Sequence, residues 1–339
     1  MKGLIFARRS IARICRPDAW FRFFKPVQRI PAAKVDFFSD PIPNAGLNLN
    51  VMSFNIRRGT AKDGRNHWTF RRNRVRELLN HYRPDVLGLQ EALDFQISEI
   101  SAMLPGYERV GIGNLGGGKG LHTAIFYDAV RFVPSAGGTF WFSDTPDIPG
   151  SKGWGNIIPR TCTWTRLIEK DSEQAFYFYN VHLDHISRRS RKNSVVVLTR
   201  FIHMRSSPDP FVLTGDFNAR ENSTPIKYLK GKIPLRIKTK GSVSNPEPSM
   251  DTFRARYPNL RNVATFHGFG KYFFRLKLDY IFVSPSVRIQ DAKIIQPQWK
   301  KYYPSDHFPL LAHIDLPVIS DSANSDAFIE KDMADEGVR

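Results

Sequence analysis

The chain has 339 residues, of which 41% are hydrophobic and 24% are charged, and its formal net charge is +18. This length allows one large domain or two ordinary ones, and no apolar stretch approaches the roughly 20 residues of a membrane-spanning helix. Two cysteines, Cys15 and Cys162, are too few for a disulfide framework, which favours a reducing compartment. The positive charge favours polyanionic partners: nucleic acid, a phosphorylated substrate or an anionic membrane surface.

Residues 1–45 differ in composition from the rest of the chain, because arginines and aromatic residues alternate there and no acid precedes Asp18. Residues 4–15 could form a basic amphipathic helix, which is typical of a matrix-targeting segment or of a helix on a membrane surface. The alternative is a loosely ordered leader. We expect a monomer without a transmembrane segment, located in the cytoplasm, or in the mitochondrion if the source is eukaryotic.

Strands and helices mix through the centre of the chain. The patterns predict strands over residues 47–56, 85–89, 124–127, 131–134, 161–168, 175–182, 211–215, 278–283 and 310–314, the third and fourth forming a hairpin. Helices are predicted over residues 70–81, 92–104 and 188–204. No domain-like linker separates these elements, so we expect one α/β domain over 46–317. Residues 318–339 are acidic and polar, which predicts a disordered tail.

Several hydrophobic runs adjoin Asn, His, Asp or Glu, as expected of buried strands whose ends open into a polar pocket. These segments are MSFNIRRG (52–59), LGLQE (87–91), NVHLDH (180–185), VLTGDFNA (212–219), KLDYIFVS (277–284) and YPSDHFPL (303–310). An unpaired charge beside an apolar run is costly, so each polar group needs a partner. Taken together, the segments predict one site assembled from the ends of many strands.

The oxygen-rich ligand types in these segments favour a hard cation. Carboxylates and amide oxygens, with few histidines and no cysteine, suit Mg²⁺ or Mn²⁺ better than zinc. We expect Asn55 and Glu91 to hold this ion, with Asp306 as a further ligand. A thiolate zinc site is not expected, because neither cysteine belongs to a CxxC pair.

The remaining polar residues suit phosphate chemistry. His182 and His307 could stabilise charge on a phosphoryl oxygen, and Asp279 would orient His307 as the acid of a dyad. Asp216 is the residue expected to position and deprotonate an attacking water. Each motif alone has a simpler explanation, since a strand-end histidine can satisfy a loop, GDFN can be a turn and SDH a cap. The prediction depends on the set and its order.

GDFN and SDHFP, in this order with the other segments, resemble the endonuclease/exonuclease/phosphatase superfamily over about residues 50–316. WFSDTPDIPGSKGW (141–154), PRTCTW (159–164) and TFHGF (265–269) are similar to a largely bacterial branch. The resemblance implies a four-layer α/β sandwich, with two mainly antiparallel sheets packed face to face and flanking helices. It also implies in-line attack of water on a P–O bond.

The resemblance assigns roles to individual residues. It implies metal ligation by Asn55 and Glu91 with Asp306 nearby, phosphate contacts from Arg160, His182 and Asn218, water positioning by Asp216 and Asn218, and a dyad of Asp279 and His307. Two positions depart from the expected pattern. Arg57 stands where some nucleases of the family carry an Asp, and His122 stands where an acidic residue is expected, in a Gly-rich loop that either shapes the substrate pocket or is a flexible surface loop.

Nucleic acid is the favoured substrate class, and a small phosphorylated molecule and a non-catalytic role remain as alternatives. Nucleic acid is favoured by the charge of the central domain and by the basic start of the helix at 188–204, where four cations follow NVHLDH: Arg188, Arg189, Arg191 and Lys192. A small phosphorylated molecule, such as a sugar phosphate, is favoured by the resemblance to the branch that carries TFHGF. A binding module without activity is less favoured, because the residues expected of a catalytic site are all present.

Overall fold

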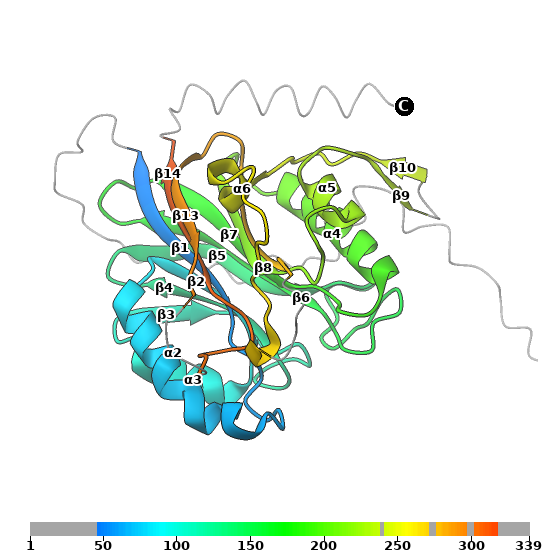
Figure 1. Ribbon diagram of the computed structural model, residues 1–339. Helices are drawn as coiled ribbons and strands as arrows, with labels where there is room; N and C mark the ends of the chain where they lie inside the picture. Colours follow the sequence, from blue (N-terminus) through cyan, green and yellow to red (C-terminus); the bar gives the residue numbers. More distant parts are fainter. Residues whose placement is uncertain (1–45, 238–240, 271–275, 297–301, 318–339) are drawn as a thin grey trace, which may run out of the picture.

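Two six-stranded sheets pack face to face, and helices cover both outer surfaces (Figure 1). The computed structural model describes residues 46–237, 241–270, 276–296 and 302–317. The expected leader and acidic tail lie outside the described residues. In the described part of the chain, no helix combines the length and apolarity needed to cross a membrane.

Sheet A contains the first and the last strands that the structure describes. Its strand order is β13 (Arg288–Ile294), β14 (Leu310–Leu316), β1 (Leu47–Asn55), β2 (Val86–Ala92), β4 (His122–Asp128) and β3 (Tyr107–Val110). β1 and β2 run parallel, and the other neighbours pair antiparallel.

Sheet B repeats the same pattern of directions. Its order is β11 (Met250–Asp251), β12 (Asp279–Val283), β8 (Phe211–Asp216), β7 (Ala175–His182), β6 (Thr161–Glu169) and β5 (Phe132–Trp141). Here β7 and β8 form the parallel pair, flanked again by antiparallel neighbours. The expected fold, with two mainly antiparallel sheets in an α/β sandwich, is confirmed.

Four of the five α-helices that the structure describes divide between the two outer faces, and the fifth contributes Phe253 to the core between the sheets. The five are α2 (Trp68–Tyr82), α3 (Asp94–Met103), α4 (Arg188–His203), α5 (Thr224–Leu229) and α6 (Thr252–Arg256), with short 3₁₀ helices η1 (Gly64–Asn66) and η2 (Gly268–Gly270). α2 and α3 pack on sheet A, while α4 and α5 pack on sheet B. A small hairpin of β9 (Leu235–Ile237) and β10 (Gly241–Val243) adjoins α4 and α5.

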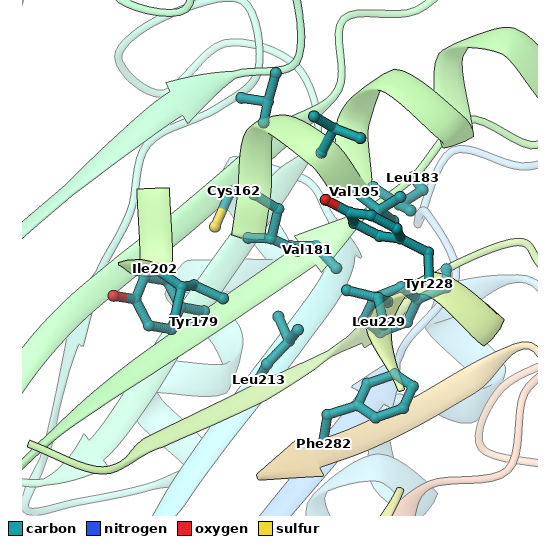
Figure 2. Packing of buried hydrophobic residues seen from close by; sticks show 14 of the residues in the cluster. Cys162, Tyr179, Val181, Leu183, Val195, Ile202, Leu213, Tyr228, Leu229 and Phe282 are labelled. Atoms are coloured by element: carbon teal, nitrogen blue, oxygen red, sulfur yellow. The ribbon is translucent and has the colours of Figure 1, made fainter. Parts of the chain in front are cut away.

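The apolar pattern of each element explains this layering. Strand side chains alternate between faces, so Val51 of β1 points into the space between the sheets while Met52 points toward α2 and α3. Helix α4 buries Val195, Leu198 and Ile202, which recur every three or four residues. Figure 2 shows this packing of α4 against the strands of sheet B.

Cys162 contributes to the same cluster, where its thiol is fully buried (Figure 2). Burial raises its pKa well above the usual value, so it is a core residue rather than a nucleophile. Cys15 lies outside the described residues.

Two predicted elements need correction. The strands expected as a hairpin at 124–127 and 131–134 belong to β4 and β5, which lie in different sheets. The chain crosses from sheet A to sheet B at this turn, which local pattern cannot distinguish from a hairpin. The helix expected from residue 92 begins at Asp94, because Glu91 and Ala92 continue β2 past an irregularity in its pairing with β4.

Candidate active site

The two parallel strand pairs end side by side and bring their terminal polar residues together. Asn55 ends β1, Glu91 lies near the end of β2, His182 ends β7 and Asp216 ends β8. Parallel strands present their carboxyl ends at one edge of a sheet, and here the edges of both sheets meet. Asp279 joins the group because it pairs with Asp216 across the antiparallel β8–β12 ladder.

Asp216 lies at the centre of the site. Its Oδ2 accepts a hydrogen bond from Asn55 Nδ2 at 3.0 Å and lies 3.6 Å from His182 Nε2 and 3.8 Å from His307 Nε2. These atoms come from both sheets and from the loop before β14. Burial, together with the charge of Asp279, raises the pKa of Asp216 to about 7. The site therefore combines carboxylates and imidazoles around one shared oxygen.

His307 and Asp279 form the expected pair. His307 Nδ1 and Asp279 Oδ2 are 2.8 Å apart. The His307 side chain is 6% exposed and the Asp279 side chain is 1% exposed. Burial alone would lower the pKa of His307, but the adjacent Asp279 carboxylate raises it to about 10. The imidazole is therefore held as a cation with Nδ1 donating to Asp279, which leaves Nε2–H directed toward Asp216.

Arg160 and His182 lie together, as expected of phosphate-binding residues. The guanidinium Nη1 is 3.1 Å from His182 Nε2, and its Nη2 is 2.7 Å from His185 Nδ1. Asp184 neutralises the buried guanidinium through a bond from Arg160 Nε at 3.3 Å. Burial and the charge of Arg160 lower the pKa of His182 well below its usual value. Both imidazoles thus accept from a permanent cation.

Asn218 is positioned by Asp216 and by the backbone just after β7. Its N–H donates to Asp216 Oδ1 at 2.9 Å, and its side-chain Nδ2 donates to Leu183 O at 3.0 Å. The backbone φ of Asn218 is +47°, in the left-handed region that non-glycine residues rarely adopt. Its side chain is half-buried at the site, and its expected contact with water or phosphate stays a prediction.

The proposed metal ligands are oxygen donors near one another. Asn55 Nδ2 lies 3.4 Å from Glu91 Oε1, and Glu91 Oε2 accepts from Arg58 N–H at 3.1 Å. Glu91 has a φ of +65°, and such strain concentrates at functional sites. Asp306 is buried nearby, where Ser305 Oγ donates to its Oδ1 at 3.2 Å.

This donor set fits a hard divalent cation, with one adjustment. Asn55 turns Nδ2 toward the carboxylates of Glu91 and Asp216, while its Oδ1 accepts from Arg57 N–H at 3.0 Å. Ligation through Oδ1 therefore requires the amide to rotate. Asp216, Asp279 and His307 also place one ligand atom each within 4.8 Å of one another, but the protonated His307 has no lone pair to offer a metal ion. Asp279 Oδ1 has no hydrogen-bond partner among the described residues. Uncompensated acidic oxygens are chemically suited to a cation.

Arg57 and His122, the two residues that depart from the family pattern, lie in different parts of the site. Arg57 forms ion pairs with Asp63 at 3.1 Å and with Asp306 at 3.6 Å, so the position adds a positive charge beside the proposed ligand Asp306. His122 is buried at the start of β4 and lines a small pocket that also involves Arg160 and His182. The Gly-rich loop before it therefore adjoins Arg160 and His182, the residues that are expected to bind phosphate.

Three residues that support the site were not singled out from the sequence. Asp184 and His185 stand within NVHLDH, but only the first histidine of that segment was considered. Arg71 of α2 is almost fully buried and donates to Ile56 O, to Arg57 O at 2.7 Å and to Pro304 O at 2.9 Å. It joins the loop after β1 to the loop that carries His307. The sequence does not distinguish Arg71 from Arg72 and Arg76, which are exposed on the same helix. Its burial could therefore not be predicted.

Comparison with known proteins identifies the class that this fold and site define. The model of the Endonuclease/Exonuclease/phosphatase family matches residues 52–307, and the chain belongs to this family. It is therefore a phosphoester hydrolase, as its fold and site residues predict.

Similar proteins extend over most of the chain. An endonuclease/exonuclease/phosphatase from Bacteroides vulgatus is 27% identical, with a TM-score of 0.71, covering 80% of this chain and 99% of that one. The mannosyl-6-phosphatase Bt3783 from Bacteroides thetaiotaomicron is 30% identical, with a TM-score of 0.66, covering 80% of this chain and all of that one. Uncharacterized protein L388 of Acanthamoeba polyphaga mimivirus is 28% identical over 279 residues, which are 78% of this chain and 98% of that protein.

Proposed function

We propose that this protein hydrolyses a phosphomonoester of a small molecule, such as a sugar phosphate, with Mg²⁺ or Mn²⁺ as cofactor. The convergence of Asn55, His182 and His307 on Asp216 Oδ2 carries this proposal, because it places a base, an imidazolium and the imidazole that holds Arg160 around one point. The similarity to a mannosyl-6-phosphatase supports a small substrate.

Each residue has a proposed role in the reaction. Asp216 accepts a proton from the attacking water, and the imidazolium of His307, held by Asp279, stabilises negative charge on the phosphoryl group. Arg160 binds phosphoryl oxygens through its remaining N–H groups, and His182, whose Nε2 accepts from Arg160, holds the guanidinium in place. Asn55, Glu91 and Asp306 would hold the metal ion, which supplies Lewis-acid polarisation of the phosphate when it is bound.

A polynucleotide is the second candidate substrate. The net charge of +18 favours it, as do the exposed Arg188 and Arg189, which start α4 three residues after the Arg160-bound His185. Phosphate backbones bind such surfaces with strong salt dependence. Salt therefore separates the two substrates, because cleavage of a polynucleotide should fall steeply as salt is added while hydrolysis of a small monoester should change little.

A substrate screen with Mg²⁺ and with Mn²⁺ tests the proposal. It should include p-nitrophenyl phosphate, sugar phosphates, inositol phosphates, RNA, and single- and double-stranded DNA. We expect release of inorganic phosphate from a sugar phosphate, and loss of about 100-fold or more of this activity in Asp216→Asn. Asp209→Asn is the matched control, because Asp209 pairs with Arg166 at 2.7 Å outside the strand-end cluster.

Two results would contradict the proposal. If Asp216→Asn is as active as the parent, Asp216 is not the base. If the parent protein hydrolyses only polynucleotides, the second candidate replaces the first.

A further inference from the structure

Arg57 lies between two acidic residues, of which one is a proposed metal ligand. Its Nε donates to Asp63 Oδ2 at 3.1 Å and its Nη2 donates to Asp63 Oδ1 at 3.2 Å, so this pair is held by two hydrogen bonds. The same Nε is 3.6 Å from Asp306 Oδ2, which is too long for a hydrogen bond. The guanidinium is therefore fixed by Asp63 and attracts Asp306 through its charge alone.

Arg57 compensates the charge of Asp306. The Asp306 side chain is 8% exposed, and among the described residues Arg57 is the one cation that forms an ion pair with it. Ser305 Oγ donates to Asp306 Oδ1 at 3.2 Å, which leaves Oδ2 on the side of the guanidinium. A buried carboxylate is costly without a compensating charge. Arg57 supplies this charge from the protein itself.

The backbone of Arg57 is anchored beside a second proposed ligand. Its N–H donates to Asn55 Oδ1 at 3.0 Å, and its carbonyl accepts from Arg71 Nη2 at 2.7 Å and from Gln96 Nε2 at 3.1 Å. The φ of Arg57 is +59°, a value that non-glycine residues rarely adopt. With both its backbone and its guanidinium held, Arg57 has little freedom to move away from Asp306.

Arg57 and a divalent cation at the proposed site would both interact with the same carboxylate. A metal ion on Asp306 replaces the attraction of the guanidinium, but it leaves the two hydrogen bonds to Asp63 intact. The two cations then lie close together in a largely buried site, where salt screens their repulsion only weakly. Each cation therefore lowers the affinity of Asp306 for the other, and this coupling is reciprocal.

We propose that Arg57 is an internal competitor of the metal ion, which neutralises Asp306 in the metal-free protein and sets the affinity of the site for Mg²⁺ or Mn²⁺. This inference rests on the proposed function, since it concerns the metal of the same site. It assigns Arg57 an effect on metal binding and no part in the chemical step.

Mn²⁺ is the probe, and the EPR signal of free Mn²⁺ measures its binding to the full chain without substrate. We expect Arg57→Gln to bind Mn²⁺ about fivefold more tightly than the parent. Arg57→Lys retains the charge and should stay closer to the parent than to Arg57→Gln. Arg58→Gln is the matched control, because it removes the same charge from an exposed neighbour. Arg58 contacts Glu91 through its backbone N–H, which glutamine retains.

A double-mutant cycle with Asp306→Asn separates competition for this carboxylate from a general effect of charge. We expect the gain in affinity from Arg57→Gln to disappear when Asp306 is replaced, because the two cations no longer share a carboxylate. Circular dichroism confirms that each variant is folded.

Three results would overturn the inference: folded Arg57→Gln binds Mn²⁺ no more tightly than the parent, Arg58→Gln gains as much affinity, or the gain persists in the Asp306→Asn background. The proposed function fails separately. A parent that shows the expected coupling but hydrolyses no phosphoester would contradict that function and leave the role of Arg57 in metal binding standing.

Discussion

Gln90 of sheet A donates a hydrogen bond across the sandwich to Asn180 of sheet B, with Nε2 and Oδ1 2.7 Å apart. Asn180 Nδ2 returns two bonds to sheet A, to Leu89 O at 2.8 Å and to Ala124 O at 2.9 Å. Both side chains are fully buried. Gln90 precedes Glu91, and Asn180 lies two residues before His182, so this link fixes the spacing between the two halves of the site.

Replacing Asn180 with alanine should therefore affect both stability and activity. The variant removes the shortest bond of Gln90, which keeps only its longer contacts to Ser53 Oγ and Gly88 O, and it takes the Asn180 donor from two buried carbonyl groups. We therefore expect a loss of about 2–4 kcal/mol in the free energy of unfolding. Urea denaturation measures this loss. Asn245→Ala is the matched control, because Asn245 Nδ2 also donates to two carbonyls, of Tyr228 and Leu229, but far along the chain from the strand ends. Equal losses of activity in the two variants would refute a special role for the cross-sheet link.

Gly88 is required by the same link. A Cβ atom at this position would lie 2.2 Å from Thr214 Oγ1 and 2.8 Å from Asn180 Oδ1. Gly88→Ala should thus force the sheets apart, with a cost of about 1–3 kcal/mol typical of overpacking. Adding Thr214→Ala removes the closest clashing atom and should recover part of the stability. Thermal unfolding of the single and double variants tests this, and additive destabilisation would show that the clash is not relieved there.

Asp279 should control the charge of His307. In Asp279→Asn the carboxylate that raises the pKa of His307 is lost while burial still lowers it, so the pKa should fall from about 10. NMR titration of the imidazole follows this change directly. We also expect kcat to fall by about 10²–10³-fold, because an imidazolium no longer stabilises the phosphoryl charge. A His307 signal that titrates as in the parent would mean that Asp279 does not hold the proton.

Chelation should remove activity, and Glu91 should account for metal affinity. Addition of EDTA should abolish phosphate release, and excess Mg²⁺ should restore it.

Glu91→Gln should raise the Mg²⁺ concentration needed for half-maximal rate by about 10-fold or more, since Mg²⁺ is bound by few protein carboxylates. Glu99→Gln provides the control, because Glu99 contacts Trp68 and Arg72 instead of the strand-end cluster. Unchanged metal dependence in Glu91→Gln would exclude Glu91 as a ligand.

Glu169 should make the free energy of unfolding depend on pH in the acidic range. Burial alone would raise its pKa, but bonds from Ser172 and the ion pair with Arg131 at 3.2 Å lower it. A carboxylate whose pKa is lower in the folded state than in the unfolded state stabilises the fold at pH values above the unfolded pKa, which is about 4.3 for Glu. This stabilisation is lost as the pH falls through the pKa of the folded state.

Glu169→Gln should consequently be less stable than the parent by about 1–2 kcal/mol at pH 7. The difference should shrink as the pH falls below about 4. Denaturation at several pH values measures it, with Asp171→Asn as a control on the exposed part of the same turn. A constant difference at every pH would mean that the charge of Glu169 is not responsible.

The sequence predicts which polar residues meet, and the class of fold, better than it predicts how the chain crosses between the sheets. Asn55, His182 and Asp216 could be located because each follows an apolar run, and polar groups at such positions need partners. The crossing of the chain between β4 and β5 could not be predicted, since a turn inside one sheet and a turn between two sheets share the same local pattern. Gln90 and Asn180 were also missed as a link, because their partners lie 90 residues apart and their register depends on sheet packing.

The pairing of β1 with β14 has a consequence for biosynthesis. β1, the first strand that the structure describes, cannot pair with β14 until β14 has been synthesised. The loop just before β14 carries His307. Translation delivers residues in order, so a ribosome-bound chain that has already completed Asn55, Glu91, His182 and Asp216 still lacks its imidazolium. We expect the proposed site to be complete only after the segment that carries His307 has emerged and β14 has paired with β1.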